Sequence, residues 1–250
     1  MLSLAVAADD RTGALEVAAA CVDAGWAGVP TVPFGVEAPP GAADVLVVDL
    51  GSRHLDRDRA AARAVSMMEI AADRHAHKID SLLRGNWAVE LVSRAGTGRR
   101  VAVVPALPSQ GRWCRGGVVL ADGTPVGAAI GSDARQGPRS SRPADHLIEA
   151  GASGVDEVAG PAALDRWLRN SGTSFAVCDV TSSDGLFALG RLLATCPDVL
   201  VAGTAEAIGS LLVSPTPTRT SPPVPVDGSV VVVCGSLHEA ARAQLGVLAG

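Results

Sequence analysis

The feature that most constrains the fold is an alternation of short apolar runs with longer amphipathic or alanine-rich stretches. Each run has the length of a strand and is almost continuously apolar, as expected for strands covered on both faces. The runs cover 2–7, 45–48, 101–104, 175–178, 199–201 and 230–234. Helices are expected near 12–24, 57–75, 87–95, 161–169, 184–195, 204–212 and 237–248. This order predicts an α/β fold: a doubly wound, mostly parallel sheet with helices on both faces, in a Rossmann-like three-layer sandwich.

Two stretches interrupt the alternation. Residues 111–154 are rich in Gly and Arg with weak periodicity, so we expect loops and a hairpin there. Residues 214–225 carry five prolines in twelve positions, which excludes a helix or a central strand. We therefore divide the chain into a first domain (1–213), a proline-rich linker (214–228) and a final segment (229–250). That last segment is expected to be the truncated start of a second domain or an element docked on the first.

Composition excludes several classes of protein. With 48% hydrophobic and 19% charged residues the chain is not expected to be disordered. A net charge of -5 argues against binding to nucleic acid through a basic face. No apolar run reaches about 18 residues, so no membrane span is expected. Five scattered cysteines without a C-x-x-C pair indicate reduced thiols and, with no basic leader, a cytoplasmic protein.

Candidate functional residues follow the predicted strands, where doubly wound folds bind their ligands. Asp9 and Asp10 come directly after the first run, and Thr12 and Gly13 then open a helix. Two adjacent carboxylates can bind polyol hydroxyls, hold a hydrated Mg²⁺ or act as a base. The alternative is that Asp10 or Thr12 merely caps the helix.

A second cluster lies in 78–86, at another expected turn from strand to helix. Of the 21 basic residues only Lys78 is a lysine, and it stands just before Asp80, Ser81 and Arg84. Arg can bind a carboxylate with two hydrogen bonds while Asp accepts one from a hydroxyl, so the cluster suits a ligand that has both groups. The alternative is a surface cluster of ion pairs, with Asn86 as a helix cap.

Two further turns are weaker candidates. The loop 105–112 could direct Arg112 at an anion, or could be an ordinary proline-rich turn. Ser236, after the last run, could bind a phosphate at a helix start, or could simply cap that helix. The chain has no G-x-G-x-x-G, no P-loop and no H-E-x-x-H string. The pair His75 and His77 has no third ligand nearby, so no metal site is expected.

Together these strings resemble the four-carbon acid sugar kinases, which act on threonate, erythronate or 3-oxo-tetronate. The first domain of that family opens with A-D-D-x-T-G-A, seen here at 8–14. It continues with K-x-D-S-T-x-R-G-N and P-A-x-P-x-N-G-R, similar to 78–86 and 105–112. Its second domain opens with G-S-x-S-x-x-T-x-x-Q, similar to 235–244. The order and approximate spacing match over essentially the whole chain.

The resemblance implies that the first domain binds an acid sugar and the second binds ATP with Mg²⁺, with phosphoryl transfer between them. Lys78 and Arg84 would hold the substrate carboxylate, and Asp10 or Asp80 would hold or deprotonate the attacking hydroxyl. Ser236 would lie near the ATP phosphates. The implied sugar site consists of Asp9, Asp10, Lys78, Asp80, Ser81, Arg84 and Arg112.

The chain also departs from the family pattern. Leu82 replaces the Thr of D-S-T, Gln110 replaces the Asn of N-G-R, and His238 replaces the second Ser of G-S-x-S. The glycine-rich ATP loops have no counterpart, so we expect weak ATP binding by this chain alone.

Three functions remain open at this point. The first is ATP-dependent phosphorylation of a small sugar acid by the complete protein. The second is a catalytically inactive sugar-acid binding or regulatory module. The third, a Rossmann-type oxidoreductase, lacks its fingerprint. An apolar face left uncovered in the first domain would also favour a homo-oligomer.

Overall fold

The computed structural model describes residues 2–38, 41, 43–129, 137, 139–170, 172–211, 231 and 239–248. The chain divides into two units, residues 1–220 and 221–250. The second unit contributes one described helix, α9 (Glu239–Leu248). The predicted linker (214–228) and Ser236 lie outside the described residues, so both remain predictions. No helix in the described part of the chain has the length and apolar character that a membrane crossing needs.

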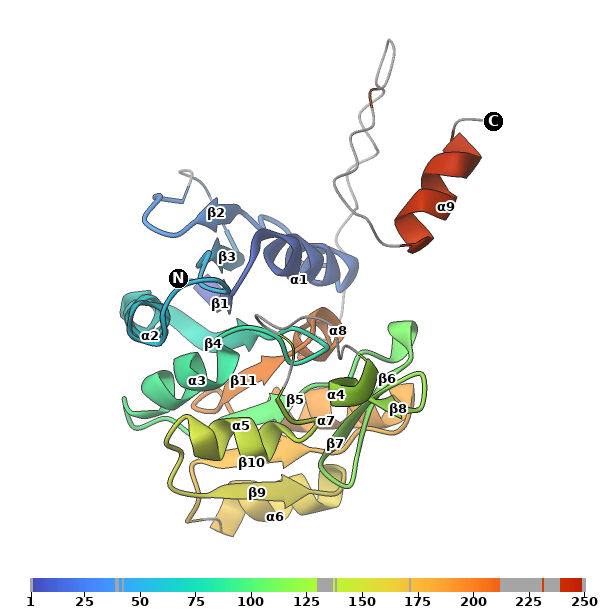
Figure 1. Cartoon of the computed structure of the whole chain (residues 1–250). Coiled ribbons are helices and arrows are strands. Elements are labelled where there is room, and N and C mark those ends of the chain that lie inside the picture. The colour runs from blue at the N-terminus through green and yellow to red at the C-terminus, as the bar shows by residue number, and fades with distance from the viewer. Residues whose placement is uncertain are drawn as a thin grey trace. The chain divides into compact units, whose positions relative to one another are not determined.

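The first unit is built on an eight-stranded sheet in the order β2-β3-β1-β4-β11-β5-β10-β9 (Figure 1). Every described pairing between neighbouring strands of this sheet is parallel. The predicted doubly wound parallel sheet is thereby confirmed. The strands are β1 (Leu2–Ala8), β2 (Thr31–Pro33), β3 (Val45–Asp49), β4 (Ala72–Lys78), β5 (Val101–Val104), β9 (Val155–Val158), β10 (Phe175–Cys178) and β11 (Leu200–Gly203).

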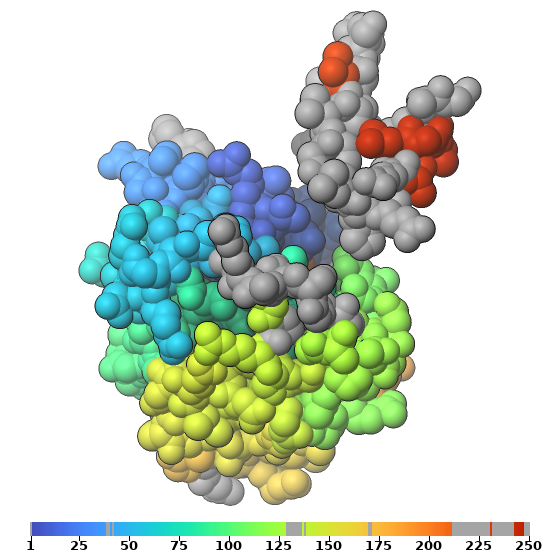
Figure 2. All heavy atoms as spheres, viewed as in Figure 1, coloured from blue at the N-terminus to red at the C-terminus, as the bar shows by residue number. Residues whose placement is uncertain are grey.

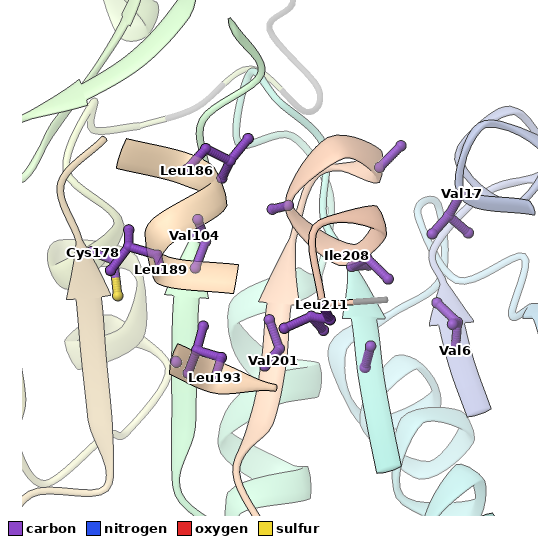
Figure 3. Packing of buried hydrophobic residues seen from close by; sticks show 14 of the residues in the cluster. Val6, Val17, Val104, Cys178, Leu186, Leu189, Leu193, Val201, Ile208 and Leu211 are labelled. Atoms are coloured by element: carbon purple, nitrogen blue, oxygen red, sulfur yellow. The ribbon is translucent and has the colours of Figure 1, made fainter. Parts of the chain in front are cut away.

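Helices cover both faces of the sheet, which explains why the strand sequences are apolar throughout. Val103 and Val104 are neighbours in β5, yet they belong to core clusters on opposite faces. In Figure 3, Leu189 and Ile208 lie over the strands on one of these faces. That face is covered by α1 (Arg11–Asp23), α6 (Pro161–Asn170), α7 (Ser183–Leu193) and α8 (Ala205–Gly209). The other carries α2 (Arg57–Ser66), the 3₁₀ turn η1 (Met67–Glu69), α3 (Trp87–Ala95) and α5 (Pro143–Glu149).

The predicted hairpin within 111–154 is present as a small antiparallel sheet. Asp179, which follows β10, accepts hydrogen bonds from the Gly116 and Gly117 amides at 2.7 and 2.9 Å and so ties the hairpin turn to the main sheet. In Figure 2 the residues of this hairpin, in bright green, lie at the surface beside the yellow-green residues that begin near 140. The strands of this small sheet are β6 (Arg112–Arg115), β7 (Val118–Ala121) and β8 (Thr124–Pro125). The turn η2 (Pro108–Gln110) precedes them in the chain, and α4 (Val126–Ala129) follows them.

The predicted helix over 57–75 is wrong in its second half. The α-helix ends at Ser66, and the chain enters β4 at Ala72. The strand was missed because it buries the polar side chains of His75 and His77, so it does not have the apolar pattern of the other central strands. The short or polar edge strands β2 and β9 and the helix α5 were missed as well.

His77 belongs to a buried polar triad that fastens α3 to β4. Its Nε2 lies 2.8 Å from Glu90 Oε2 and its Nδ1 lies 3.1 Å from Arg94 Nη1, and none of the three residues is exposed. Burial lowers the pKa of His77 and lowers that of Arg94 to about 9. The triad therefore consists of a neutral imidazole held between a carboxylate and a guanidinium.

Replacing Arg94 by Ala is expected to lower the free energy of unfolding by about 3 to 5 kcal/mol, because it removes the charge that acts on the buried Glu90 carboxylate and leaves His77 Nδ1 and the Ala76 carbonyl without their donor. Urea denaturation measures the change. The matched control is Arg166→Ala, at an exposed position, which should stay within about 0.5 kcal/mol of the parent. Equal effects of the two variants would contradict the structural role given to the triad.

Candidate functional site

A crevice lies where the connections of two neighbouring strands diverge. β1 leads into α1 on one face of the sheet, whereas β4, which pairs with β1, is followed by α3 on the other face. In parallel α/β sheets such a switch point leaves room for a ligand at the carboxyl ends of the strands. Asp9 and Asp10 follow β1, and Asp80 comes two residues after β4. The topology thus brings the two predicted clusters to one place.

One arginine that the sequence analysis did not select joins the three predicted aspartates. Arg53 Nε and Nη2 donate to the two carboxylate oxygens of Asp9 at 2.7 and 3.0 Å. Its Nη1 lies 2.7 Å from Asp10 Oδ2, and its Nη2 lies 3.5 Å from Asp80 Oδ1. The only signal for Arg53 in the sequence is its position shortly after the predicted strand 45–48.

Asp9 is fully buried and lies behind the crevice rather than on its wall. Burial raises the pKa of this carboxyl to about 6, although the hydrogen bonds and charge of Arg53 act in the opposite direction. Its position also explains Gly85, which has a φ of +89° and where a Cβ would lie 2.9 Å from Asp9 Oδ2. Asp9 therefore orients Arg53, and we do not expect it to contact a ligand directly.

Asp10 caps a helix, as the alternative interpretation of the sequence predicted, and it also pairs with Arg53. Its Oδ1 caps α1 by accepting a hydrogen bond from the Gly13 amide at 2.8 Å, while Oδ2 pairs with Arg53. The side chain is 27% exposed and lines the crevice. A Cβ at Gly13 would lie 2.9 Å from Asp10 Oδ1 and 3.3 Å from Lys78 Nζ, so glycine at this position leaves room for both side chains.

Asp80 organises the turn after β4. Its Oδ2 accepts hydrogen bonds from the Leu82 and Arg84 amides at 3.1 and 3.2 Å and from Arg84 Nε at 2.9 Å. Its Oδ1 accepts from Arg84 Nη2 at 2.7 Å. The turn includes Leu83 at a φ of +61°, a left-handed conformation that is uncommon for this residue type. Burial acts to raise the pKa of Asp80, but Arg84 and Arg53 outweigh it and hold the pKa below its ordinary value.

The crevice encloses a cavity of about 260 Å³. Three cations on its wall keep unused N–H donors among the described contacts. Lys78 Nζ contacts only Glu16 and the Ile79 carbonyl, Arg84 Nη1 has no partner, and Arg112 Nε is buried without one. Of the seven residues predicted for the sugar site, the cavity is lined by Asp10, Lys78, Asp80, Ser81, Arg84 and Arg112.

The residues fit a small anion better than a metal ion. Within the described part of the chain, no group of three or more His, Cys, Asp or Glu side chains is arranged to hold a metal. The carboxylates of Asp9, Asp10 and Asp80 are instead paired with arginines. The crevice therefore has no built Mg²⁺ site of its own.

Fold and crevice define an α/β domain that can take a small polar ligand at the switch point of its sheet. Residues 4–211 match the family model described as a sugar-binding N-terminal domain, and the chain belongs to that family. It is 31% identical to a D-threonate kinase of Cupriavidus necator, over 94% of this chain and 61% of that protein. It is 27% identical to a D-threonate kinase of Salmonella typhimurium, over 98% of this chain and 60% of that protein. The resemblance to the four-carbon acid sugar kinases is confirmed, and the chain spans about three fifths of the length of these relatives.

Solved structures agree on the fold. A Bordetella bronchiseptica domain of unknown function, solved with bound citrate as a domain-swapped dimer, has 27% identity and a TM-score of 0.72. The match covers 84% of this chain and 55% of that chain. A protein of Salmonella typhimurium LT2 has 22% identity and a TM-score of 0.74, over 85% of this chain and 55% of that chain.

The raised pKa of Asp9 makes stability depend on pH in a defined direction. The folded state holds this proton up to about pH 6, whereas an aspartate of the unfolded chain releases it near pH 4. The stabilising contribution is therefore complete below about pH 4 and is lost as the pH rises through 6. Relative to Asp9→Asn, the wild type should lose about 3 kcal/mol of unfolding free energy between pH 4 and pH 7. Denaturant titrations across this range measure the difference, and a constant difference would contradict the raised pKa.

Proposed function

We propose that this chain is the substrate-binding part of a four-carbon acid sugar kinase and that its crevice binds a small hydroxylated monocarboxylate such as threonate or erythronate. The observation that carries the proposal is the cavity lined by Asp10, Lys78 and Arg84, where Lys78 and Arg84 keep unused N–H donors among the described contacts. Cations bind a carboxylate through charge-assisted hydrogen bonds, and carboxylates accept hydrogen bonds from sugar hydroxyls. The two related D-threonate kinases support this class of substrate.

The size of the cavity agrees with a short acid. Its volume of about 260 Å³ lies below the range of about 300 to 1,000 Å³ that is typical of pockets for drug-sized ligands. We assign the ligand carboxylate to Lys78 and Arg84 and the hydroxyls to Ser81 and Asp10, all of which line the cavity.

We assign different roles to the two aspartates that the sequence could not distinguish. Four hydrogen bonds occupy the carboxylate of Asp80, which makes it a positioning group for Arg84. Asp10 lines the cavity and its Oδ2 has Arg53 as its described partner, so we assign to Asp10 the role of orienting the attacking hydroxyl and accepting its proton. An oriented hydroxyl beside a carboxylate is what phosphoryl transfer needs from the acceptor side.

ATP and Mg²⁺ belong to the reaction of the complete kinase. They supply the phosphoryl group and the cation that neutralises it. Ser236, the residue predicted beside the phosphates, lies outside the described residues, and the crevice carboxylates are held by arginines. We therefore assign no step of the reaction in this chain to Mg²⁺.

Location and assembly are part of the proposal. The four cysteines among the described residues are free thiols, which fits a reducing cytoplasm. Self-association is supported by the domain-swapped dimer of the Bordetella bronchiseptica relative.

Calorimetric titration with D-threonate tests the binding step. The wild type should bind threonate but not threitol, which lacks the carboxylate. Lys78→Met should weaken binding by about 10- to 100-fold, because it removes one charge-assisted hydrogen bond. Arg166→Ala is the control and should bind as the wild type does. No binding of threonate or erythronate at millimolar concentration would remove the proposal.

The roles of Asp10 and Asp80 are separable by their amide variants. Asp10→Asn should keep the helix cap, because Asn caps a helix as well as Asp, and should bind threonate within about threefold of the wild type, whereas the complete kinase with this change should lose ATP-dependent phosphorylation. Asp80→Asn should lower both stability and affinity, because Arg84 loses its paired acceptor. Thermal melting measures stability and calorimetry measures the affinity for threonate. ADP release measures phosphorylation and is followed with the complete kinase. Equal behaviour of the two variants would contradict the division of roles, and threonate binding by the complete protein without any ADP release would favour an inactive binding module.

A further inference from the structure

We propose that Glu16 limits the charge of the ligand: the crevice accepts an acid with one carboxylate and discriminates against a diacid of the same length. The inference deepens the proposed function and rests on it, because it concerns the same crevice. It assigns a specificity role to a residue on α1 that no sequence motif singled out.

Glu16 lies at the rim of the cavity and contacts its most buried cation. Its Oε2 is 3.3 Å from Lys78 Nζ. The Glu16 side chain is 43% exposed, whereas that of Lys78 is 5% exposed. Among the described residues, the other contact of the ammonium group is the Ile79 carbonyl at 3.1 Å. A ligand carboxylate that reaches Lys78 must therefore share this cation with Glu16.

The charges around the cavity balance only when Glu16 is counted. The wall carries four cations and three carboxylates, and Asp9 lies buried behind Arg53 as the fourth carboxylate. Asp122 also approaches Arg112, at 3.5 Å, but it is 82% exposed and lies outside the cavity lining, where water screens it. The cations are Arg53, Lys78, Arg84 and Arg112, and the carboxylates of the wall are Asp10, Glu16 and Asp80.

This balance makes each additional negative charge less favourable. A monoanion leaves the crevice with one excess negative charge, and a dianion leaves it with two. The second carboxylate of a diacid must share a cation that already has a carboxylate partner, because Arg53 pairs with Asp9, Arg84 with Asp80 and Arg112 with Asp122. Neutralising Glu16 frees Lys78 from its competitor and gives the empty cavity a net positive charge. Both effects favour anions, and both favour a dianion more than a monoanion.

The test compares two ligands that differ in one group. D-threonate and the tartrate of matching stereochemistry share their carbon chain and both secondary hydroxyls, and only tartrate has a second carboxylate in place of the terminal hydroxymethyl group. Isothermal titration calorimetry at constant ionic strength gives the affinity of each ligand for the wild type, Glu16→Gln and Asp23→Asn. The control variant removes one negative charge from an exposed position at the far end of the same helix. Circular dichroism checks that all three proteins are folded.

We expect the wild type to bind threonate at least tenfold more tightly than tartrate. Glu16→Gln should reduce this preference at least fivefold, mainly through tighter binding of tartrate, and Asp23→Asn should leave it within twofold. Threonate binding with the same preference in the wild type and in Glu16→Gln overturns the role of Glu16 but leaves the proposed function intact. A lack of binding of both ligands to all three proteins overturns the proposed function and this inference together.

Discussion

The guanidinium of Arg53, held between carboxylates from two strand ends, is the interaction on which the site depends. Asp9, Asp10 and Asp80 meet at the carboxyl ends of β1 and β4, where their charges would repel one another without a shared cation. Asp9 is also fully buried, and a buried carboxylate needs a paired and hydrogen-bonded cation to remain charged. Arg53 meets both needs because the loop after β3 places it beside Asp9.

The pairing of the aspartates decides which groups remain for a ligand. Arg53 is engaged with three carboxylates and Arg84 is aligned by Asp80, so within the described part of the chain Lys78 Nζ and Arg84 Nη1 are donors that remain for a ligand in the crevice. The surrounding glycines keep this arrangement accessible: a side chain at Gly13 or Gly85 would press on a carboxylate. The parallel sheet supplies a rigid support, and the ligand-facing groups lie on turns at its end, as is usual for binding sites on α/β domains.

Much of the fold was predictable from the sequence, because burial on both faces leaves continuous apolar runs such as 101–104. The strand β4 was not, since its buried histidine His77 is stabilised by Glu90 and Arg94, and such a pairing is visible only in three dimensions. The same contrast holds for the site, of which one part was predictable from the sequence and another was not. The string that begins at the end of β4 stood out because it holds the single lysine, Lys78. Arg53, in contrast, is one of many arginines, and its role follows from the neighbours that the topology gives it.

The decisive measurement is a crystal structure from crystals soaked with D-threonate, because it shows directly whether the crevice binds the sugar acid. We expect the ligand in the crevice between β1 and β4, with its carboxylate within hydrogen-bond distance of Lys78 and Arg84 and a hydroxyl hydrogen-bonded to Asp10. Threonate bound elsewhere on the first unit, with the crevice empty, would contradict it.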